Sequence, residues 1–310
     1  MSDIKLFRLD NQQATEIAGS ATHLEKPLQT LIEANLDPLL GIRFLASEYS
    51  TGKTHGGRID TLGIDENHCP VILEYKRTTS ENVINQGLYY LDWLMDHQAE
   101  FKLLVLETFD KAAANAIDWS APRLVCIAAD FTRYDGHAVQ QINRNIELIR
   151  YRRFGTELLL LELVNAVTAD SRKTPAGPIA APKSGGNGKI SRDKPITEWL
   201  ANMPPKLAPV FEALDTLVLS LGDDVQRKDM KLYIAYKRLR NFATVIFQKK
   251  RVILYLHLEP KHLKDFESIA RDVTNVGHWG TGNAEISLTS AADFEKAKPL
   301  INLAYGVTLS

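Results

Sequence analysis

The 310-residue sequence has few of the features that mark secreted, fibrous or membrane-spanning proteins. Its two cysteines, Cys69 and Cys126, are too few for a disulfide framework or a four-thiolate zinc site. Its 18 glycines and 13 prolines exclude collagen-like and mucin-like sequence. No run approaches the roughly eighteen apolar residues of a membrane-spanning helix, and the first residues lack an apolar signal-peptide segment. We therefore expect a cytoplasmic protein without a membrane partner.

What remains is ordinary globular composition, 45% hydrophobic and 24% charged, with enough apolar content to exclude disorder throughout. The net charge of −1 conceals an asymmetry. Residues 1–165 hold 16 Lys and Arg against 23 Asp and Glu, whereas residues 166–310 hold 21 against 15. Halves of opposite charge are typical of two modules with different tasks. The basic half could contact a polyanion, although a solvated surface explains either half equally well.

The sequence divides into two predicted domains. Residues 168–195 lose all apolar periodicity and collect Pro, Gly, Ser, Lys and Ala, a composition that predicts a flexible linker. In residues 1–167, helical and strand patterns interleave, which predicts a mixed α/β core. Residues 196–310 predict a smaller, basic α+β domain that binds nucleic acid or another partner.

Apolar periodicity and turn residues place the individual elements. In the first domain we expect a helix from about 24 to a break at Pro38, a strand at 42–50, a Gly-rich turn at 51–57, a hairpin turning near Glu66–Asn67, a helix at 81–98, a strand at 123–129, a helix at 135–150 and a strand at 157–164. In the second we expect a helix at 195–220 interrupted at Pro204–Pro205, two or three strands within 231–258, and helices at 261–270 and 291–304.

The residues that suggest chemistry lie in the predicted hairpin, GGRIDTLGIDENHCPVILEYKR. Glu74 and Lys76 are two positions apart and therefore share a strand face, and the turn can bring Asp60 beside Glu74. Two neighbouring carboxylates repel each other, and a divalent cation relieves that repulsion. An adjacent ammonium can orient water or stabilise charge on a scissile phosphate. This set suits metal-assisted phosphodiester hydrolysis; the alternative is a pair of charges on a solvated hairpin face.

The same hairpin resembles the PD-(D/E)xK nuclease superfamily. The family pattern is an acidic residue, a spacer and then Glu-or-Asp-x-Lys on the next strand, which Asp60, Glu74 and Lys76 match. Ile59 stands where the motif name has proline, a residue that many members of the superfamily also lack.

Two further motifs extend the resemblance over residues 25–90, about a fifth of the chain. Glu25, in HLEKPLQTLIE, occupies the place of the first-helix glutamate of many members. Gln86-Gly-Leu-Tyr-Tyr90 is similar to the Gln-x-x-x-Tyr motif of members related to the RecB nuclease domain. The chain also resembles the NucS-type branch of the superfamily, in which a linker joins a similar nuclease domain to a second domain.

The resemblance implies a restriction-endonuclease-like fold, with a mixed central sheet flanked by helices, and a nuclease that requires Mg²⁺ or Mn²⁺. Asp60 and Glu74 would be metal ligands together with the main-chain carbonyl of Tyr75, and Glu25 would bind a metal directly or through water. Lys76 would position or activate the attacking water. Gln86 would help to fix the substrate or the lysine.

Other residues are weaker candidates for substrate contact. Arg58 and Arg77 flank the predicted site and could touch phosphate, and Tyr90 could act there or simply pack its helix on the sheet. In the basic half, Lys and Arg residues interleave with aromatic residues, a pattern that suits backbone charge and base stacking. Its members in the motif YIAYKRLRNF are Lys237, Arg238 and Arg240.

The sequence thus predicts a metal-dependent endonuclease or deoxyribonuclease whose C-terminal domain contributes substrate binding. Single-stranded and branched DNA are among its candidate substrates, and a homodimer would allow paired cuts on both strands. The alternative is a non-catalytic nucleic-acid-binding or regulatory protein that retains the nuclease fold.

Overall fold

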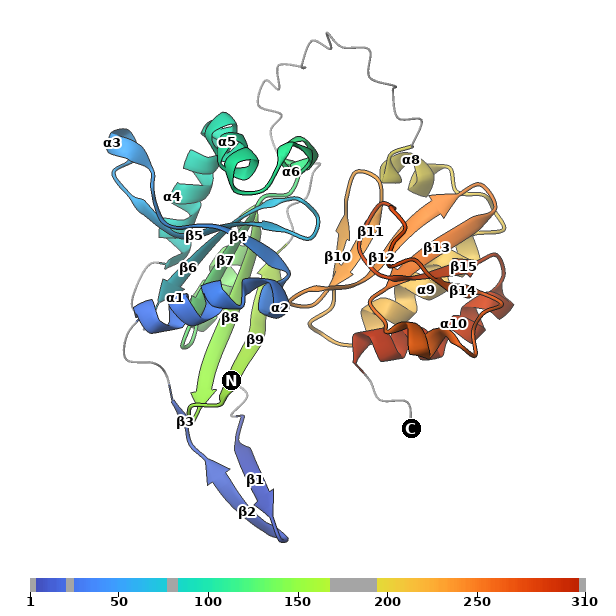
Figure 1. Ribbon diagram of the computed structural model, residues 1–310, viewed down its shortest axis with the longest axis horizontal. Helices are drawn as coiled ribbons and strands as arrows, with labels where there is room; N and C mark the ends of the chain where they lie inside the picture. Colours follow the sequence, from blue (N-terminus) through green and yellow to red (C-terminus); the bar gives the residue numbers. More distant parts are fainter. Residues whose placement is uncertain (1–3, 21–24, 77–82, 168–193, 307–310) are drawn as a thin grey trace. The chain divides into compact units, whose positions relative to one another are not determined.

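The computed structural model describes residues 4–20, 25–76, 83–167 and 194–306, and the chain forms two compact units, residues 1–174 and 175–310 (Figure 1). Each unit has its own sheet and its own hydrophobic core. Most of the predicted linker, 168–195, lies outside the described residues. Within the described residues, no helix is both long enough and apolar enough to cross a membrane.

The N-terminal unit is built on a mixed sheet whose strand order, in the described residues, is β3-β8-β7-β6-β5-β4, with β9 paired to β8. Strand β5 runs antiparallel to both of its neighbours, β4 and β6, whereas β6, β7 and β8 are parallel. A separate two-stranded sheet, β1 with β2, precedes it. The strands are β1 (Leu6–Asp10), β2 (Gln13–Ile17), β3 (Gly19–Ser20), β4 (Ile42–Ser50), β5 (Arg58–Asp65), β6 (Pro70–Lys76), β7 (Arg123–Ala128), β8 (Asn145–Phe154) and β9 (Leu158–Val167).

Helices lie on both faces of this sheet, as expected for a mixed α/β fold. Side chains alternate along β6, so Ile72 and Tyr75 point to opposite faces. Ile72 joins the core beneath α4, whereas the Tyr75 hydroxyl lies by Thr61, which contacts Glu33 of α1. The helices are α1 (Glu25–Ala34), α2 (Leu36–Leu40), α3 (Gly52–His55), α4 (Val83–Asp96), α5 (Gln98–Thr108), α6 (Lys111–Ala116) and α7 (Arg133–Gln140).

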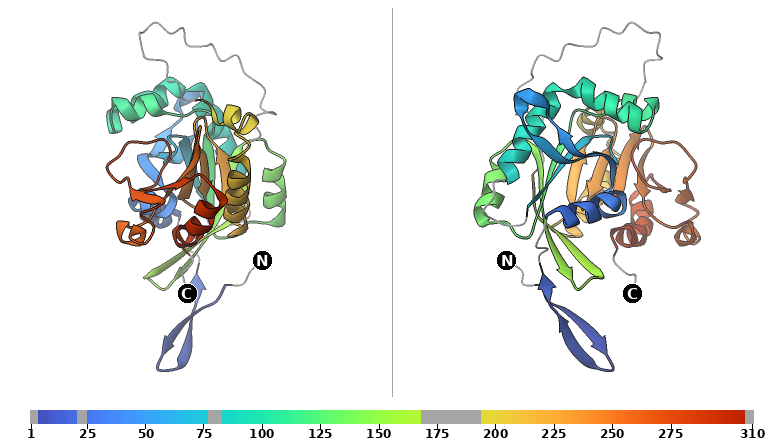
Figure 2. Two further views of the ribbon diagram at one scale, coloured as in Figure 1. Left: turned by 90° about the vertical axis from the view of Figure 1, so that its right-hand side faces the viewer. Right: turned by 60° about the vertical axis from the view of Figure 1, so that its left-hand side comes forward.

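The C-terminal unit is an antiparallel sheet with its helices on one side (Figure 2). Its strand order is β10-β11-β12-β13-β15-β14. Residues of α8, α9 and α10 share one core with the sheet face that they cover, and among the described residues no α-helix packs on the other face. The elements are α8 (Ile196–Ala201), α9 (Ala208–Ser220), β10 (Gln226–Asp229), β11 (Ile234–Lys237), β12 (Asn241–Gln248), β13 (Arg251–Leu256), the 3₁₀ turn η1 (Pro260–Leu263), β14 (Ala270–Asp272), β15 (Ala284–Leu288) and α10 (Ala291–Tyr305).

The structure confirms the hairpin, the strands at β7 and β9, and the final helix, but it corrects two predicted helices. The segment 135–150 becomes α7 followed by β8, because β8 pairs in parallel with β7 and is buried on both faces. The segment 261–270 begins as a 3₁₀ turn and ends in β14, which pairs with the edge of β15. In both, a tertiary partner overrides the local helical pattern.

The break predicted at Pro38 is also misplaced. The chain leaves the helical conformation at Asn35, and α2 then runs through Pro38 to Leu40. Proline is compatible with the first turn of a helix because the main-chain N–H that it lacks has no helical acceptor there.

Candidate functional site

The candidate site is centred on the open end of the hairpin formed by β5 and β6. The ladder pairs Thr61 with Leu73, so one further step places Asp60 opposite Glu74. At that step side chains replace main-chain partners. The Asp60 N–H donates to Glu74 Oε1 at 3.2 Å, and the Tyr75 N–H donates to Asp60 Oδ2 at 2.9 Å. The two predicted carboxylates are therefore brought together, each held by a main-chain donor.

Glu74 is fully buried in the centre of the sheet. Burial and, next, the neighbouring Asp60 charge raise the pKa of its carboxyl to about 9. One carboxyl oxygen, Oε2, is buried without a hydrogen-bond partner in the described part of the chain. A buried acceptor without a partner is costly, and in native structures it often marks a functional position or the place of an ion.

Lys76 follows two residues later, on the same face as Glu74, as its spacing predicted. Its side chain is half-buried, and its positive charge counteracts the rise in the Glu74 pKa. Beside Glu74 in the parallel register with β7 lies Cys126, which is fully buried. Burial raises the pKa of the Cys126 thiol, and a thiol that stays protonated is not a nucleophile. Cys126 is therefore not a candidate nucleophile, and Lys76 carries a positive charge on this face.

Gln86 and Tyr90 come to the same hairpin from α4. Gln86 Nε2 lies 3.3 Å from the Tyr90 hydroxyl, and that hydroxyl accepts the Arg58 N–H at 3.1 Å. Tyr90 is buried, and a Cβ on Gly57 would lie 2.5 Å from its ring. Tyr90 thus fixes the start of β5, two residues before Asp60, which is a packing role as much as a site role.

The opposite side of the hairpin is held by α1, through a residue that was not singled out from the sequence. Gln29 donates to the Asp60 carbonyl oxygen at 2.7 Å and to Ser47 Oγ at 3.2 Å. Its side chain is almost fully buried, although it lies on the apolar stripe of its helix. A polar residue on such a stripe was the available signal. Glu25 begins α1 one turn earlier, and its side chain is not among those described.

Of the two arginines predicted to flank the site, the structure describes Arg58. Arg58 is exposed, and its Nη1 atom lies 3.6 Å from Glu48 Oε2. Glu48 also pairs with Lys26 at 2.9 Å, and this ammonium lowers the pKa of Glu48. Arg77 lies outside the described residues.

Asp60 and Glu74 carry the kind of oxygen atoms that bind a hard divalent cation. Such ions prefer carboxylate oxygens, and Glu74 Oε2 is a buried oxygen without a hydrogen bond. Among the described residues, however, no group of three His, Cys, Asp or Glu could hold a metal ion. Asp60 and Glu74 would therefore need water or a main-chain oxygen to complete a coordination shell. The sequence suggested the Tyr75 carbonyl oxygen as a third ligand. At Tyr75 it is the main-chain N–H whose hydrogen bond to Asp60 joins this residue to the site.

The basic residues singled out in the C-terminal unit are mostly engaged within that unit. Lys237 is buried in β11. Arg238 donates to Asp224 at 2.6 Å, and its guanidinium lies 4.6 Å from the centre of the Tyr305 ring. Arg240 lies half-buried in the turn between β11 and β12.

Comparison with known proteins gives relatives without an assigned activity. Residues 196–308 match a family model described as a domain of unknown function, DUF5655. An uncharacterized protein of Haemophilus influenzae is 29% identical over 309 residues, which cover 97% of this chain and 99% of the relative. No solved structure matches the chain. The match to the relative extends over both units of this chain.

Proposed function

We propose that the protein is a metal-dependent nuclease that hydrolyses DNA phosphodiester bonds in its N-terminal unit. The observation that carries the proposal is the meeting of Asp60 and Glu74 at the end of one hairpin, with Glu74 Oε2 buried and lacking a hydrogen bond. Lys76, on the same face, supplies an ammonium group that can orient water or balance charge on a phosphate.

A restriction-endonuclease-like fold is part of this proposal. It is supported by the antiparallel pair β5 and β6, followed by α4 and then by β7 parallel to β6. Asp60 and Glu74 lie on neighbouring strands of the sheet and Gln86 on the helix that follows them, which supports the resemblance to the PD-(D/E)xK superfamily.

In this mechanism, Asp60 and Glu74 would hold Mg²⁺ or Mn²⁺, which when bound acts as a Lewis acid and lowers the pKa of a coordinated water. The side chains of the chain do the remaining work. Ionised Glu74 is the form that binds a cation, so binding has to release the proton that burial favours. The Lys76 ammonium orients the attacking water or balances charge on the phosphate. The Tyr90 hydroxyl keeps the start of β5, and with it Asp60, in place.

The test is cleavage of linear, circular, single-stranded and branched DNA with Mg²⁺ or Mn²⁺. We expect cleavage by the wild type and at least about a hundredfold loss in Asp60→Ala and in Lys76→Ala. Matched controls are Asp92→Ala and Lys102→Ala, which remove the same charges from exposed positions of α4 and α5. If Lys76→Ala cleaves as fast as the wild type, the proposal is wrong.

A second candidate is a nucleic-acid-binding protein without turnover. It is favoured by the raised pKa of Glu74, because a protonated Glu74 beside Asp60 needs no cation. Under this alternative, DNA binding would persist in a chelator and none of the four DNA forms would be cut with either metal.

A further inference from the structure

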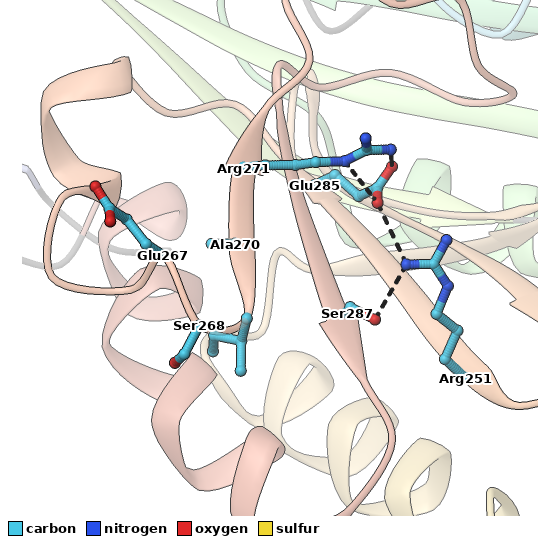
Figure 3. A pocket seen from close by; sticks show the side chains of 8 residues that line it. Arg251, Glu267, Ser268, Ala270, Arg271, Glu285 and Ser287 are labelled. Carbon is cyan, nitrogen blue, oxygen red and sulfur yellow. Dashed lines mark hydrogen bonds and ion pairs between the residues drawn. The ribbon is translucent and has the colours of Figure 1, made fainter.

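A pocket of about 320 Å³ opens on the helix-free face of the C-terminal sheet (Figure 3). It is lined by parts of β13, β14 and β15 and by the chain that leads into β14. Strand β15 lies between the other two, and its register places Glu285 opposite both Tyr255 and Arg271. Residues opposite one another in a ladder share a face, so these side chains meet on the open side of the sheet.

Two arginines converge on Glu285 in this pocket. Arg271 donates to both oxygens of its carboxylate, at 3.0 Å from Nε and 2.8 Å from Nη2. Arg251 approaches from β13, with Nη1 at 3.5 Å from Glu285 Oε1 and 3.2 Å from Ser287 Oγ. Glu285 itself is buried, and the Tyr255 hydroxyl donates to it at 3.3 Å. The buried carboxylate therefore fixes two guanidinium groups side by side.

These contacts do not use all the donors of the two guanidinium groups. In the described part of the chain, Arg271 bonds through Nε and Nη2, which leaves Nη1, and its side chain is 61% exposed. Arg251 bonds through Nε and Nη1, which leaves Nη2. Two positive charges face one buried negative charge. Glu267 also lines the pocket, but its carboxylate points away from the arginines (Figure 3).

The surroundings extend the positive charge and add aromatic surface. The exposed Lys249 and Lys250 form the turn that leads directly into Arg251. On the other side, the His278 ring stacks on Tyr255 at 3.9 Å, and the next residue, Trp279, is half-exposed. Basic residues and an exposed aromatic residue close to a pocket in the chain suit a single-stranded nucleic acid, whose phosphates and bases are bound by different groups.

We propose that this pocket binds a backbone phosphate of single-stranded DNA, held between Arg251 and Arg271. Glu285 positions both guanidinium groups, Lys249 and Lys250 follow the backbone, and Trp279 offers a surface on which a base stacks. A guanidinium held in a fixed orientation donates to phosphate through paired N–H groups, which a mobile lysine does not. The choice of DNA as ligand rests on the proposed nuclease function; the phosphate site itself rests on the pocket.

The test is fluorescence-anisotropy binding of the full-length protein to a labelled oligothymidine of about 20 nucleotides over a series of salt concentrations. EDTA is present throughout, so that cleavage cannot contribute. The variant is Arg251→Ala with Arg271→Ala. Its matched control is Lys296→Ala with Lys298→Ala, which removes the same charge from α10, on the helix-covered side of the sheet. Circular dichroism checks that both variants fold.

We expect the arginine variant to bind roughly tenfold more weakly, with the slope of log affinity against log salt reduced by about 1, and the lysine control to bind as the wild type does. Trp279→Ala should weaken binding while leaving that slope unchanged, because stacking releases no counterions. Equal binding by the arginine variant and its control would overturn the proposal. A competition experiment gives a second contrary outcome: thymidine monophosphate displaces the oligothymidine no better than buffer of the same chloride concentration does, and Trp279→Ala binds as tightly as the wild type.

Because metal is absent from this assay, its result is separate from that of the cleavage test. A protein that binds DNA through the pocket but never cuts would retain this inference and lose the proposed activity. A protein that cuts DNA and binds it equally well without the two arginines would do the reverse.

Discussion

At Glu74, burial in the sheet opposes ionisation of the carboxyl group. Its raised pKa means that, without metal, the folded state binds a proton that the unfolded state has released between about pH 4.5 and pH 9. A carboxyl whose folded pKa is raised lowers stability as the pH increases through that window. Glu74→Gln cannot ionise and keeps the shape of the side chain.

We therefore expect metal-free Glu74→Gln to be more stable than the wild type near pH 8, by about 2 kcal/mol, and nearly equal to it near pH 5. Calorimetry in a chelator at both pH values measures this difference. The control is Glu107→Gln, an exposed glutamate of α5, which should change stability little at either pH. A glutamine variant that is less stable than the wild type near pH 8 would show that the fold requires the ionised carboxylate.

At the scale of elements, Gly87 allows α4 to pack closely against the sheet. A Cβ at this buried position would lie 2.4 Å from Leu124 Cδ1, in the core of β7. Alanine normally favours a helix over glycine by about 1 kcal/mol, but here it would force α4, with Gln86 and Tyr90, away from β7. We expect Gly87→Ala to lower the free energy of unfolding by about 1 to 3 kcal/mol.

A double-mutant cycle identifies the cause of that loss. Leu124→Ala removes the clashing methyl groups, so combined with Gly87→Ala it should cost at least about 1 kcal/mol less than the two single changes added together. Gly136→Ala in α7 is the matched helical control, because its Cβ would meet only the end of the Asn165 side chain, at 3.2 Å. Strict additivity of Gly87→Ala and Leu124→Ala would place the strain elsewhere.

The same scale separates what the sequence could predict from what it could not. The hairpin of β5 and β6 was predictable because a local turn joins strands with clear patterns, and the spacing of Asp60, Glu74 and Lys76 then follows from strand geometry. The strand β8 was not, because its residues follow a helical pattern until β7 offers a parallel partner. Gln29 was missed for a similar reason: its acceptor, the Asp60 carbonyl, is 31 residues away in the sequence.

At the scale of the whole molecule, the two units divide the chemistry that we propose. The hairpin with the carboxylate pair lies in residues 1–174, and the arginine pocket lies in residues 175–310. This division agrees with the charge asymmetry of the sequence, since the acidic half would hold a cation and the basic half a phosphate backbone. Each ligand should therefore stabilise one unit and leave the other unchanged.

Binding to the native state alone raises the free energy of unfolding by about 2.7 kcal/mol at a ligand concentration one hundred times its Kd. We expect calorimetry of the full chain to resolve two transitions, of which Mg²⁺ or Mn²⁺ raises one. Gly87→Ala identifies that transition, because it should lower the melting temperature of the N-terminal unit alone. In Asp60→Ala the metal-dependent shift should vanish.

If the metal instead raised the other transition, the acidic cation site would lie outside the hairpin. If neither transition moved, Asp60 and Glu74 would be a structural pair, and the nucleic-acid-binding protein without turnover would become the better description of the whole chain.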